Sequence, residues 1–205
     1  ASNTLLGLIN QTLDFSKIEA GKLELNHEEF SLLEFFKKMR ALFYLTAKEK
    51  GLKFEIELIG DIPEHVVGDS LRLEQIVLNL LGNALKFTDY GYIRIVVRRE
   101  ASVTEAIKLI ILIEDSGIGI SADKIDSLFE TFNQADSSTS RRYGGTGLGL
   151  TISRALSQLM DGSLEARSEL GKGSQFRLAI CIKESLNPKT FTQVDLNNYM
   201  EQWDT

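Results

Sequence analysis

The stretch Asn79-Leu-Leu-Gly-Asn-Ala-Leu-Lys-Phe-Thr88 decides how this chain folds and what it can bind. Its leucines recur at helical spacing, and Asn79 and Asn83 are four residues apart, so both amides share one face of a helix. Two carboxamide oxygens on a partly buried face can bind a hard cation such as Mg²⁺, which prefers oxygen ligands. The alternative is that both asparagines cap or crosslink neighbouring backbone.

A second stretch, Asp115-Ser-Gly-Ile-Gly-Ile120, follows a run of Ile and Leu that is typical of a strand. Asp115 is therefore expected at a strand end, and Gly117 and Gly119 allow backbone to approach a ligand closely. A lone carboxylate on the floor of a pocket accepts a hydrogen bond from the amino group of adenine, whereas guanine presents a carbonyl there. The site would then favour ATP over GTP, and a calcium loop or a plain turn is the alternative.

A third stretch, Gly144-Gly-Thr-Gly-Leu-Gly-Leu150, opens a predicted helix, so its N–H groups and the helix dipole suit a polyphosphate. No Gly-Lys-Ser/Thr follows, which excludes a Walker A loop, and Leu150 stands where a Rossmann fingerprint has its last glycine. A flexible hinge is the alternative. By itself, Gly171-Lys-Gly-Ser-Gln-Phe176 is an ordinary hairpin turn.

The remaining chain predicts helices interspersed with paired strands. Helices are expected over residues 1–20, 31–51, 69–87, 121–130, 147–160 and 194–203, and strands over 22–30, 54–58, 92–99, 107–114, 163–168 and 174–183. Residues 133–146 are almost wholly polar, and so long a polar loop inside a compact domain is functional or disordered. The order of elements predicts an α+β fold, a two-layer α/β sandwich with helices on one face of a mixed sheet.

Composition narrows the function classes. The chain has 205 residues, of which 43% are hydrophobic and 25% charged, and its net charge of −6 disfavours a nucleic-acid partner. The single cysteine, Cys181, excludes an internal disulfide framework and a Cys-rich metal site, and indicates a reducing compartment. We find no signal-peptide pattern and no apolar run near the ~20 residues of a membrane span. We expect a cytoplasmic location, which is compatible with a parent protein anchored in the inner membrane.

Taken in order, these motifs resemble those of the GHKL ATPase superfamily, and more closely those of sensor histidine kinases of the hybrid type. The N box is residues 79–87, the first G box residues 115–120 and the F box Phe129-Glu-Thr-Phe132, and the two later glycine clusters are the second and third G boxes. Residues 14–22 resemble the junction between dimerisation hairpin and ATP-binding domain. The resemblance implies a Bergerat-type ATP-binding fold. It divides the chain into the end of a hairpin helix (1–21), an ATP-binding catalytic domain (22–184) and a C-terminal tail or linker (185–205).

The resemblance also implies roles for single residues. Asn83 coordinates Mg²⁺ with help from Asn79. Lys86 reaches the phosphates, and Asp115 binds adenine. Further nucleotide contacts are implied at Gly117, Gly119, Phe132, Gly145, Thr146, Gly147, Leu148 and Gly149.

The polar loop receives its role from the same resemblance. Residues 133–146 form the ATP lid, and Phe129 and Phe132 anchor the base of that lid. Either Arg141 or Arg142 touches the γ-phosphate, and the pattern does not separate the two.

The function implied is binding of Mg-ATP and transfer of its γ-phosphoryl group to a histidine on the dimerisation hairpin, in two-component signalling with a downstream response-regulator receiver domain. The family's acceptor histidine is followed by an acidic residue and usually by Arg-Thr-Pro, and neither His27 nor His65 has that context. We therefore expect the acceptor helix to be absent and the chain alone not to phosphorylate itself. Residues 1–20, without their hairpin mate, are expected to form a weak homodimer.

Two other functions compete with this one. Hydrolysing members of the superfamily carry a glutamate at the place of Asn79 to activate water, and an amide cannot act as a general base. Asn79 therefore favours transfer to another protein over hydrolysis. The second alternative is a non-catalytic nucleotide-binding or scaffold domain, which intact motifs disfavour.

Overall fold

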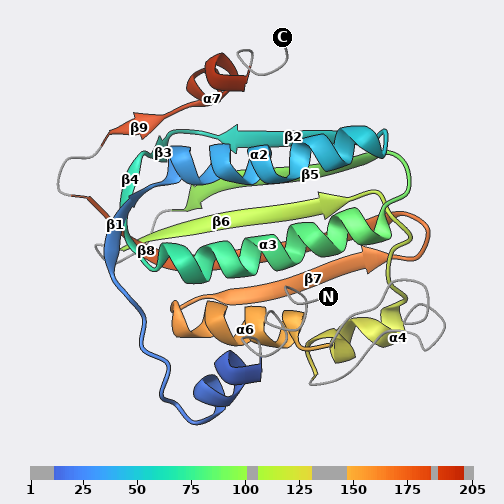
Figure 1. Ribbon diagram of the computed structural model, residues 1–205, viewed down its shortest axis with the longest axis horizontal. Helices are drawn as coiled ribbons and strands as arrows, with labels where there is room; N and C mark the ends of the chain where they lie inside the picture. Colours follow the sequence, from blue (N-terminus) through green and yellow to red (C-terminus); the bar gives the residue numbers. More distant parts are fainter. Residues whose placement is uncertain (1–11, 101–105, 131–146, 186–188, 201–205) are drawn as a thin grey trace.

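The structure, a computed structural model, describes residues 12–100, 106–130, 147–185 and 189–200. Its main strands are β1 (Glu28–Ser31), β2 (Lys53–Ile59), β4 (His65–Gly68), β5 (Tyr92–Glu100), β6 (Ala106–Asp115), β7 (Ser163–Glu169) and β8 (Gly173–Glu184). They form one seven-stranded sheet in the order β1-β4-β8-β6-β5-β2, and β7 also pairs with β8 (Figure 1). Because β2 and β5 are parallel and the other pairs antiparallel, the mixed sheet predicted from the sequence is confirmed.

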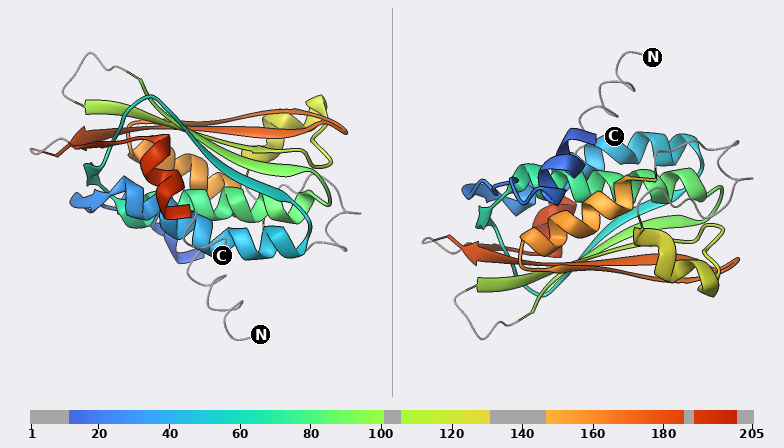
Figure 2. Two further views of the ribbon diagram at one scale, coloured as in Figure 1. Left: turned by 90° about the horizontal axis from the view of Figure 1, so that it is seen from above. Right: turned by 90° about the horizontal axis from the view of Figure 1, so that it is seen from below.

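Three helices cover the same face of this sheet, as the edge-on views show (Figure 2). They are α2 (Leu32–Glu49), α3 (Ser70–Phe87) and α6 (Gly149–Leu159). The predicted two-layer α+β sandwich is thereby confirmed. Among the residues that the structure describes, no helix is both long and apolar enough to cross a membrane.

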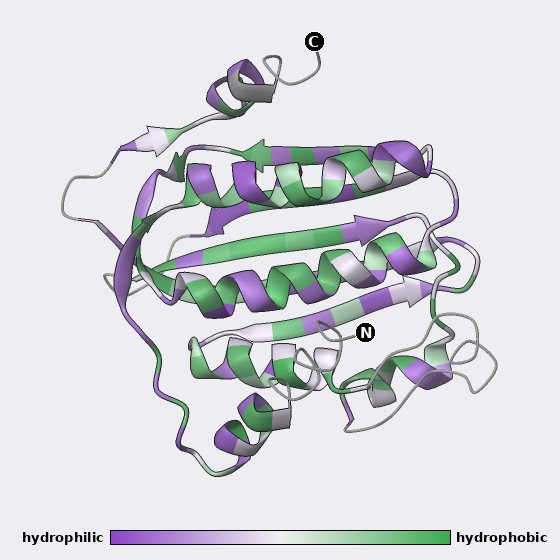
Figure 3. Ribbon diagram, viewed as in Figure 1, coloured by the Kyte–Doolittle hydropathy of each residue, from purple (hydrophilic) through white to green (hydrophobic). Residues whose placement is uncertain are grey.

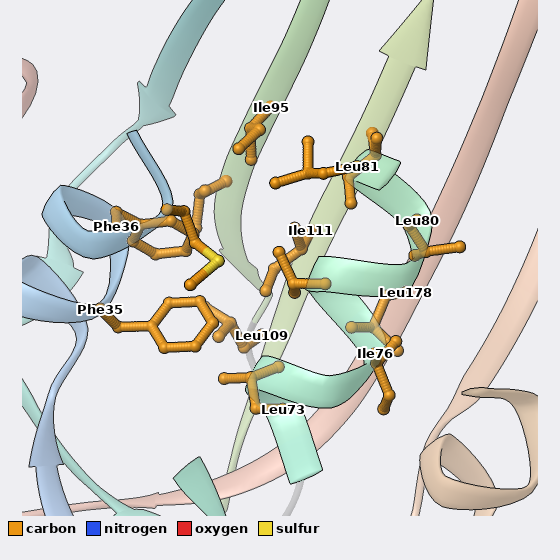
Figure 4. Packing of buried hydrophobic residues seen from close by; sticks show 14 of the residues in the cluster. Phe35, Phe36, Leu73, Ile76, Leu80, Leu81, Ile95, Leu109, Ile111 and Leu178 are labelled. Carbon is orange, nitrogen blue, oxygen red and sulfur yellow. The ribbon is translucent and has the colours of Figure 1, made fainter. Parts of the chain in front are cut away.

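The core lies between the two layers. On α3, Leu73, Ile76 and Leu80 recur at helical spacing and are fully buried, and they face Ile111 and Leu178 of the sheet (Figure 4). Strand β6 is apolar along most of its length, whereas α2 and α3 carry apolar residues mainly on one side (Figure 3). Helix α3, which carries Asn79 and Asn83, is therefore fixed by its buried face.

Among the element boundaries that differ from the sequence-based expectation, three have a local cause in the structure. The strand expected over 22–30 is only β1, because the Asn26 N–H donates to the Asp69 carboxylate (2.9 Å), the N-cap of α3. The helix expected from residue 147 begins at Gly149, because Gly147 has a φ of 72°, in the left-handed region.

The helix expected over 121–130 is divided into α4 (Ala122–Ile125) and the 3₁₀ turn η1 (Asp126–Phe129). Here the Ser127 hydroxyl donates to the Lys124 carbonyl (3.2 Å), and side-chain bonds of this kind compete with regular helical bonding.

The helical segment 12–19 docks on α3 through a polar clasp. The Asp14 carboxylate accepts hydrogen bonds from Arg72 Nη1 and Gln75 Nε2, both at 3.0 Å. Phe15 and Ile18 pack against the core of the domain. Part of the apolar stripe expected to seek a partner is thus covered by its own domain, while residues 1–11 lie outside the described residues. The weak homodimer remains a prediction.

The C-terminal segment packs at the β2 edge of the sheet (Figure 1). Its strand β9 (Thr190–Phe191) pairs with β3 (Ile62–Pro63), and α7 (Gln193–Met200) lies near the helix expected over 194–203. The Gln193 side chain accepts from the Leu58 N–H (2.6 Å) and donates to the Ile56 carbonyl (3.1 Å). Within the stretch expected as a tail or linker, residues 189–200 therefore cover the sheet edge.

Candidate functional site

Asp115 stands at the end of β6, as expected, and is buried. Its Oδ1 accepts the Gly117 N–H at 2.8 Å. Burial raises the pKa of the Asp115 carboxyl. Hydrogen bonds from the N–H groups of Gly117 and Ser174 oppose that rise, and so does the nearby Thr88 side chain. We call Thr88, Asp115, Gly117, Gly119 and Ser174 the Asp115 cluster.

The glycines of this cluster are explained by close packing of backbone on backbone. The Ile118 N–H donates to the Phe87 carbonyl (3.2 Å), and a Cβ at Gly117 would collide with that same carbonyl oxygen. Gly119 has a φ of 68°, and a Cβ there would collide with the Glu169 carbonyl. The close approach that the sequence predicts at both glycines is therefore, in the described structure, an approach to the protein's own backbone.

The turn between β7 and β8 packs against the Asp115 cluster through hydrogen bonds. Ser174 pairs with Asp115 in the strand register, and the Gly171 N–H donates to the Ile118 carbonyl at 2.7 Å. Ser168 Oγ accepts the Ile120 N–H (2.8 Å) and lies beside Ser174. By its spacing alone this stretch indicates a hairpin turn, and the resemblance makes it the third G box. The supporting role of Ser168 and Ser174 depends on strand pairing, and no local pattern indicates it.

Asn79 and Asn83 lie one turn apart on α3, and their side chains have different surroundings. Asn79 Nδ2 donates to Ser153 Oγ on α6 (3.0 Å), and a Cβ at Gly149 would collide with Asn79 Oδ1. Asn79 thus crosslinks α3 to the first turns of α6 through a side chain, whereas the alternative considered above had both asparagines bonded to neighbouring backbone. Asn83 is half-buried and makes no hydrogen bond to another described residue. Asn79, Asn83, Lys86 and the first turn of α6 form what we call the asparagine cluster.

Lys86 is half-buried in the last turn of α3, and burial lowers the pKa of its ammonium group. The ammonium nitrogen lies 4.8 Å from the centroid of the Phe87 ring. A partly desolvated cation of this kind gains more from a nearby polyanion than an exposed lysine does.

The first turn of α6 is suited to an anion. No side chain caps the N-terminus of this 11-residue helix, and no acidic residue lies in its first turn. Leu148 is buried, so any contact it makes with a ligand comes from its backbone. Backbone N–H groups and the positive end of the helix dipole therefore face the side on which the glycine cluster lies.

The polar loop that precedes α6 is bracketed by contacts to α6. The Arg154 guanidinium carbon lies 4.9 Å from the centroid of the Phe129 ring, and Thr151 Oγ1 donates to the Glu130 carbonyl at 3.2 Å. Phe129, predicted at the base of the lid, is thus attached to α6. The remaining predicted positions lie outside the described residues: Phe132, Arg141, Arg142, Gly145, Thr146 and the lid 133–146.

The residues present fit a Mg²⁺ site that depends on amide oxygens. Asn83 has no competing hydrogen bond among the described residues, and Asn79 uses its nitrogen for Ser153, so that its oxygen is left as an acceptor. Over the same residues, no group of three or more His, Cys, Asp and Glu side chains could hold a metal. A cation here would therefore take its other ligands from phosphates and water, as Mg²⁺ commonly does.

Comparison with known proteins identifies the family to which the chain is similar. Residues 68–184 match the family described as histidine kinase-, DNA gyrase B-, and HSP90-like ATPase. The chain is 43% identical over 188 residues to the signal transduction histidine-protein kinase BarA of Escherichia coli, covering 92% of this chain and 20% of BarA. It is 43% identical over 180 residues to hybrid signal transduction histidine kinase B of Dictyostelium discoideum, covering 88% and 9%. The chain thus spans a fifth or less of these two relatives.

A solved structure gives the same result in three dimensions. The crystal structure of full-length ShkA in complex with AMPPNP superposes with a TM-score of 0.74 and 30% sequence identity, covering 91% of this chain and 37% of ShkA. The match in fold therefore includes nearly the whole chain.

Proposed function

The chain belongs to the family of histidine kinase-, DNA gyrase B- and HSP90-like ATPases, as the ATP-binding catalytic domain of a histidine kinase, and we propose that it uses Mg-ATP to phosphorylate a histidine on another segment. In this proposal the Asp115 cluster holds the adenine, with the carboxylate as acceptor for the amino group. The asparagine cluster holds the triphosphate, with the ammonium of Lys86 and the N–H groups of α6 on the phosphates. The AMPPNP bound to ShkA supports an adenine nucleotide as the ligand.

The observation that carries transfer over hydrolysis is the chemistry of Asn79. Its side-chain nitrogen donates to Ser153, and an amide has no basic site with which to take a proton from water. A hydrolysing family member needs a general base next to the γ-phosphate. An amide that crosslinks two helices instead orients ligands, which is what phosphoryl transfer to a positioned acceptor requires.

The proposed reaction is an in-line displacement. A nitrogen of the acceptor imidazole forms a bond to the γ-phosphorus, the bond to the bridging oxygen breaks, and ADP leaves with that electron pair while the imidazole proton passes to water. Mg²⁺, held by Asn83 and Asn79, would supply neutralisation of phosphate charge. Lys86 and the backbone N–H groups of α6 would hold the phosphate oxygens, and one of Arg141 and Arg142 would add a further cation.

The chain's own histidines are badly placed to be the acceptor. His65 precedes Val66, which pairs with Glu184 at one end of β8, whereas Asp115 pairs with Ser174 ten residues away along that strand. Ten residues of strand span about 33 Å. His27 directly precedes β1, and the first residue of β1, Glu28, pairs with Gly68. Gly68 lies just before the N-terminal end of α3, whereas Lys86 lies at its C-terminal end. We therefore expect both imidazoles to lie too far from the γ-phosphate for the ~3–3.5 Å approach that in-line attack requires.

The partners follow from the same reasoning. The acceptor histidine is proposed to lie on the dimerisation hairpin whose last helical turns are residues 12–19, and the phosphoryl group is proposed to pass to a response-regulator receiver domain. The relatives that are named hybrid kinases support the second partner.

The test uses γ-labelled ATP and the chain with and without a separate hairpin fragment of the parent protein. We expect acid-labile label on the hairpin fragment and none on the chain alone, with release of inorganic phosphate much slower than transfer. The matched control is Asp115→Asn, which should abolish most labelling at limiting ATP. Label on the chain alone that disappears in His27→Ala or His65→Ala would overturn the proposal, as would fast phosphate release without transfer.

A further inference from the structure

Thr88 is a buried polar residue of the Asp115 cluster that has so far been given no role of its own. It ends α3 as the C-cap, in extended conformation, and its side chain is completely buried. Within the part of the chain that the structure describes, Thr88 Oγ1 has no hydrogen-bond partner. A buried hydroxyl without a partner costs about 1–3 kcal/mol, so it calls for a specific explanation.

The neighbour of this hydroxyl is the carboxylate of Asp115. Thr88 is one of three groups whose contact lowers the pKa of Asp115, and the other two are the backbone N–H groups of Gly117 and Ser174. The backbone donors are fixed by the loop and by the strand register. The hydroxyl, by contrast, can rotate, and it lies beside the carboxylate without meeting hydrogen-bond geometry.

No charged side chain takes the same place among the described residues. Lys50 donates to backbone carbonyls at the end of α3, and the ammonium of Lys86 lies over an aromatic ring. Glu114, the residue before Asp115 in β6, belongs to the opposite face of the sheet. The side chain that can adjust to the state of the Asp115 carboxylate is therefore the Thr88 hydroxyl.

We propose that Thr88 is a positioning residue for base recognition. When a nucleotide base binds to one lone pair of the Asp115 carboxylate, the Thr88 hydroxyl donates its hydrogen to a different lone pair of the same carboxylate. The inference rests on the proposed function, because it requires a purine at Asp115. With the hydroxyl as donor, the carboxylate is held ionised and presents only acceptors to the base. A purine with an amino group at C6 then finds a partner, and a purine with a carbonyl at C6 meets an acceptor.

The consequence is base selectivity that depends on one hydroxyl. Without the hydroxyl donor, the buried carboxylate takes up a proton more readily and can then donate to a carbonyl. Removal of the hydroxyl should therefore weaken binding of ATP and relax the rejection of inosine triphosphate, which carries a carbonyl at C6. Loss of one hydrogen bond to a charged group corresponds to about tenfold in affinity.

The experiment compares Thr88→Val, Thr88→Ala and Thr88→Ser with the wild-type chain by calorimetric titration of Mg-ATP and Mg-inosine triphosphate. Valine keeps the shape without the hydroxyl, alanine removes both, and serine keeps the hydroxyl alone. We expect the ratio of the two affinities to fall about tenfold in the valine and alanine variants and to stay near wild type in the serine variant. Either hydroxyl-free variant suffices if the other does not fold.

The second readout is the pH dependence of ATP affinity. Because Thr88 lowers the pKa of Asp115, its removal should move the loss of affinity on the acid side to higher pH, and Thr88→Ser should restore the wild-type profile. An unchanged ratio and profile in both hydroxyl-free variants would overturn the inference. A serine variant that behaves like valine would also overturn it, because the methyl group would then be what matters. Failure of the wild-type chain to bind ATP would instead overturn the proposed function.

Discussion

The Asp115 cluster and the asparagine cluster both adjoin the C-terminal half of α3, and they are built in different ways. Backbone holds the first: N–H groups reach the carboxylate, and the Ile118 N–H and carbonyl bond to the Phe87 carbonyl and the Gly171 N–H. The second is held by side chains, chiefly the Asn79–Ser153 bond, and contains the partly desolvated Lys86. The difference predicts that the proposed base site is fixed before binding, and that the nucleotide completes the ligands of the proposed phosphate site.

The largest effect on ATP affinity should come from a substitution in the Asp115 cluster. We expect Asp115→Asn to weaken ATP binding by roughly tenfold or more, because the new NH₂ meets the amino group of adenine donor to donor, at a cost of about 1–3 kcal/mol. Isothermal titration calorimetry measures this. The matched control is Glu114→Gln. The wild-type Glu114 carboxylate accepts a hydrogen bond from Gln175 on the other face of the sheet, so this substitution should leave ATP affinity unchanged.

Stability should not follow affinity in that variant. Burial raises the folded-state pKa of Asp115, so its contribution to stability is present at acid pH and lost as pH rises through that pKa. At neutral pH the ionised carboxylate therefore favours unfolding, and Asp115→Asn should unfold no more easily than wild type. Equal ATP affinities for the variant and wild type would remove Asp115 from the base site.

The second prediction separates the two asparagines. Asn79→Ala leaves the buried Ser153 hydroxyl without its donor and should lower the free energy of unfolding by about 1–3 kcal/mol. Asn83→Ala breaks no bond to a described residue and should change it by about 0.5 kcal/mol or less. Both variants should weaken the Mg²⁺ dependence of ATP binding. Denaturant unfolding and titration of Mg²⁺ at fixed ATP are the measurements, and equal unfolding curves would contradict the crosslink.

The third prediction uses pH to change the charge of one residue in each cluster, Asp115 in the first and Lys86 in the second. Adenosine affinity should fall on the acid side, because protonation of Asp115, whose pKa burial raises, removes an acceptor. ATP affinity should also fall several-fold on the alkaline side, where Lys86, whose pKa burial lowers, loses its proton earlier than an exposed lysine does. Lys86→Met should remove the alkaline loss for ATP, and adenosine should never show it. An alkaline loss for adenosine would place Lys86 at the base.

Local sequence spacing predicts the helix and the strand that carry the two clusters. It does not predict contacts between residues that are far apart in the sequence. The leucines around Asn79 and the strand before Asp115 predict α3 and β6 because helix and strand periods are local properties. The partner of Asn79 is different. Ser153 lies on the buried face of α6 next to Ile152. A serine on an apolar helix face indicates that a buried hydrogen bond is present, but the sequence does not identify the partner.

The same reason explains the other unpredicted contacts. Thr88 becomes a neighbour of Asp115 only when α3 ends beside β6, and Gln193 reaches Leu58 from 135 residues away in the sequence. The contacts predicted at Arg141 and Arg142 lie outside the described residues and stay predictions.

The smallest effect is expected at Lys50, which contacts the C-terminal end of α3. Lys50 ends α2, and its ammonium donates to the Leu85 carbonyl (2.7 Å) and the Thr88 carbonyl (3.4 Å) at the end of α3, where a cation also complements the helix dipole. Because Lys50 is exposed, water replaces most of what Lys50→Met removes. We expect about 0.5 kcal/mol less stability in thermal unfolding and an ATP affinity within about twofold of wild type. A larger loss of affinity at unchanged stability would mean that Lys50 sets the position of the α3 end. The Asp115 cluster and the asparagine cluster would then be one coupled unit, because both depend on where that helix stops.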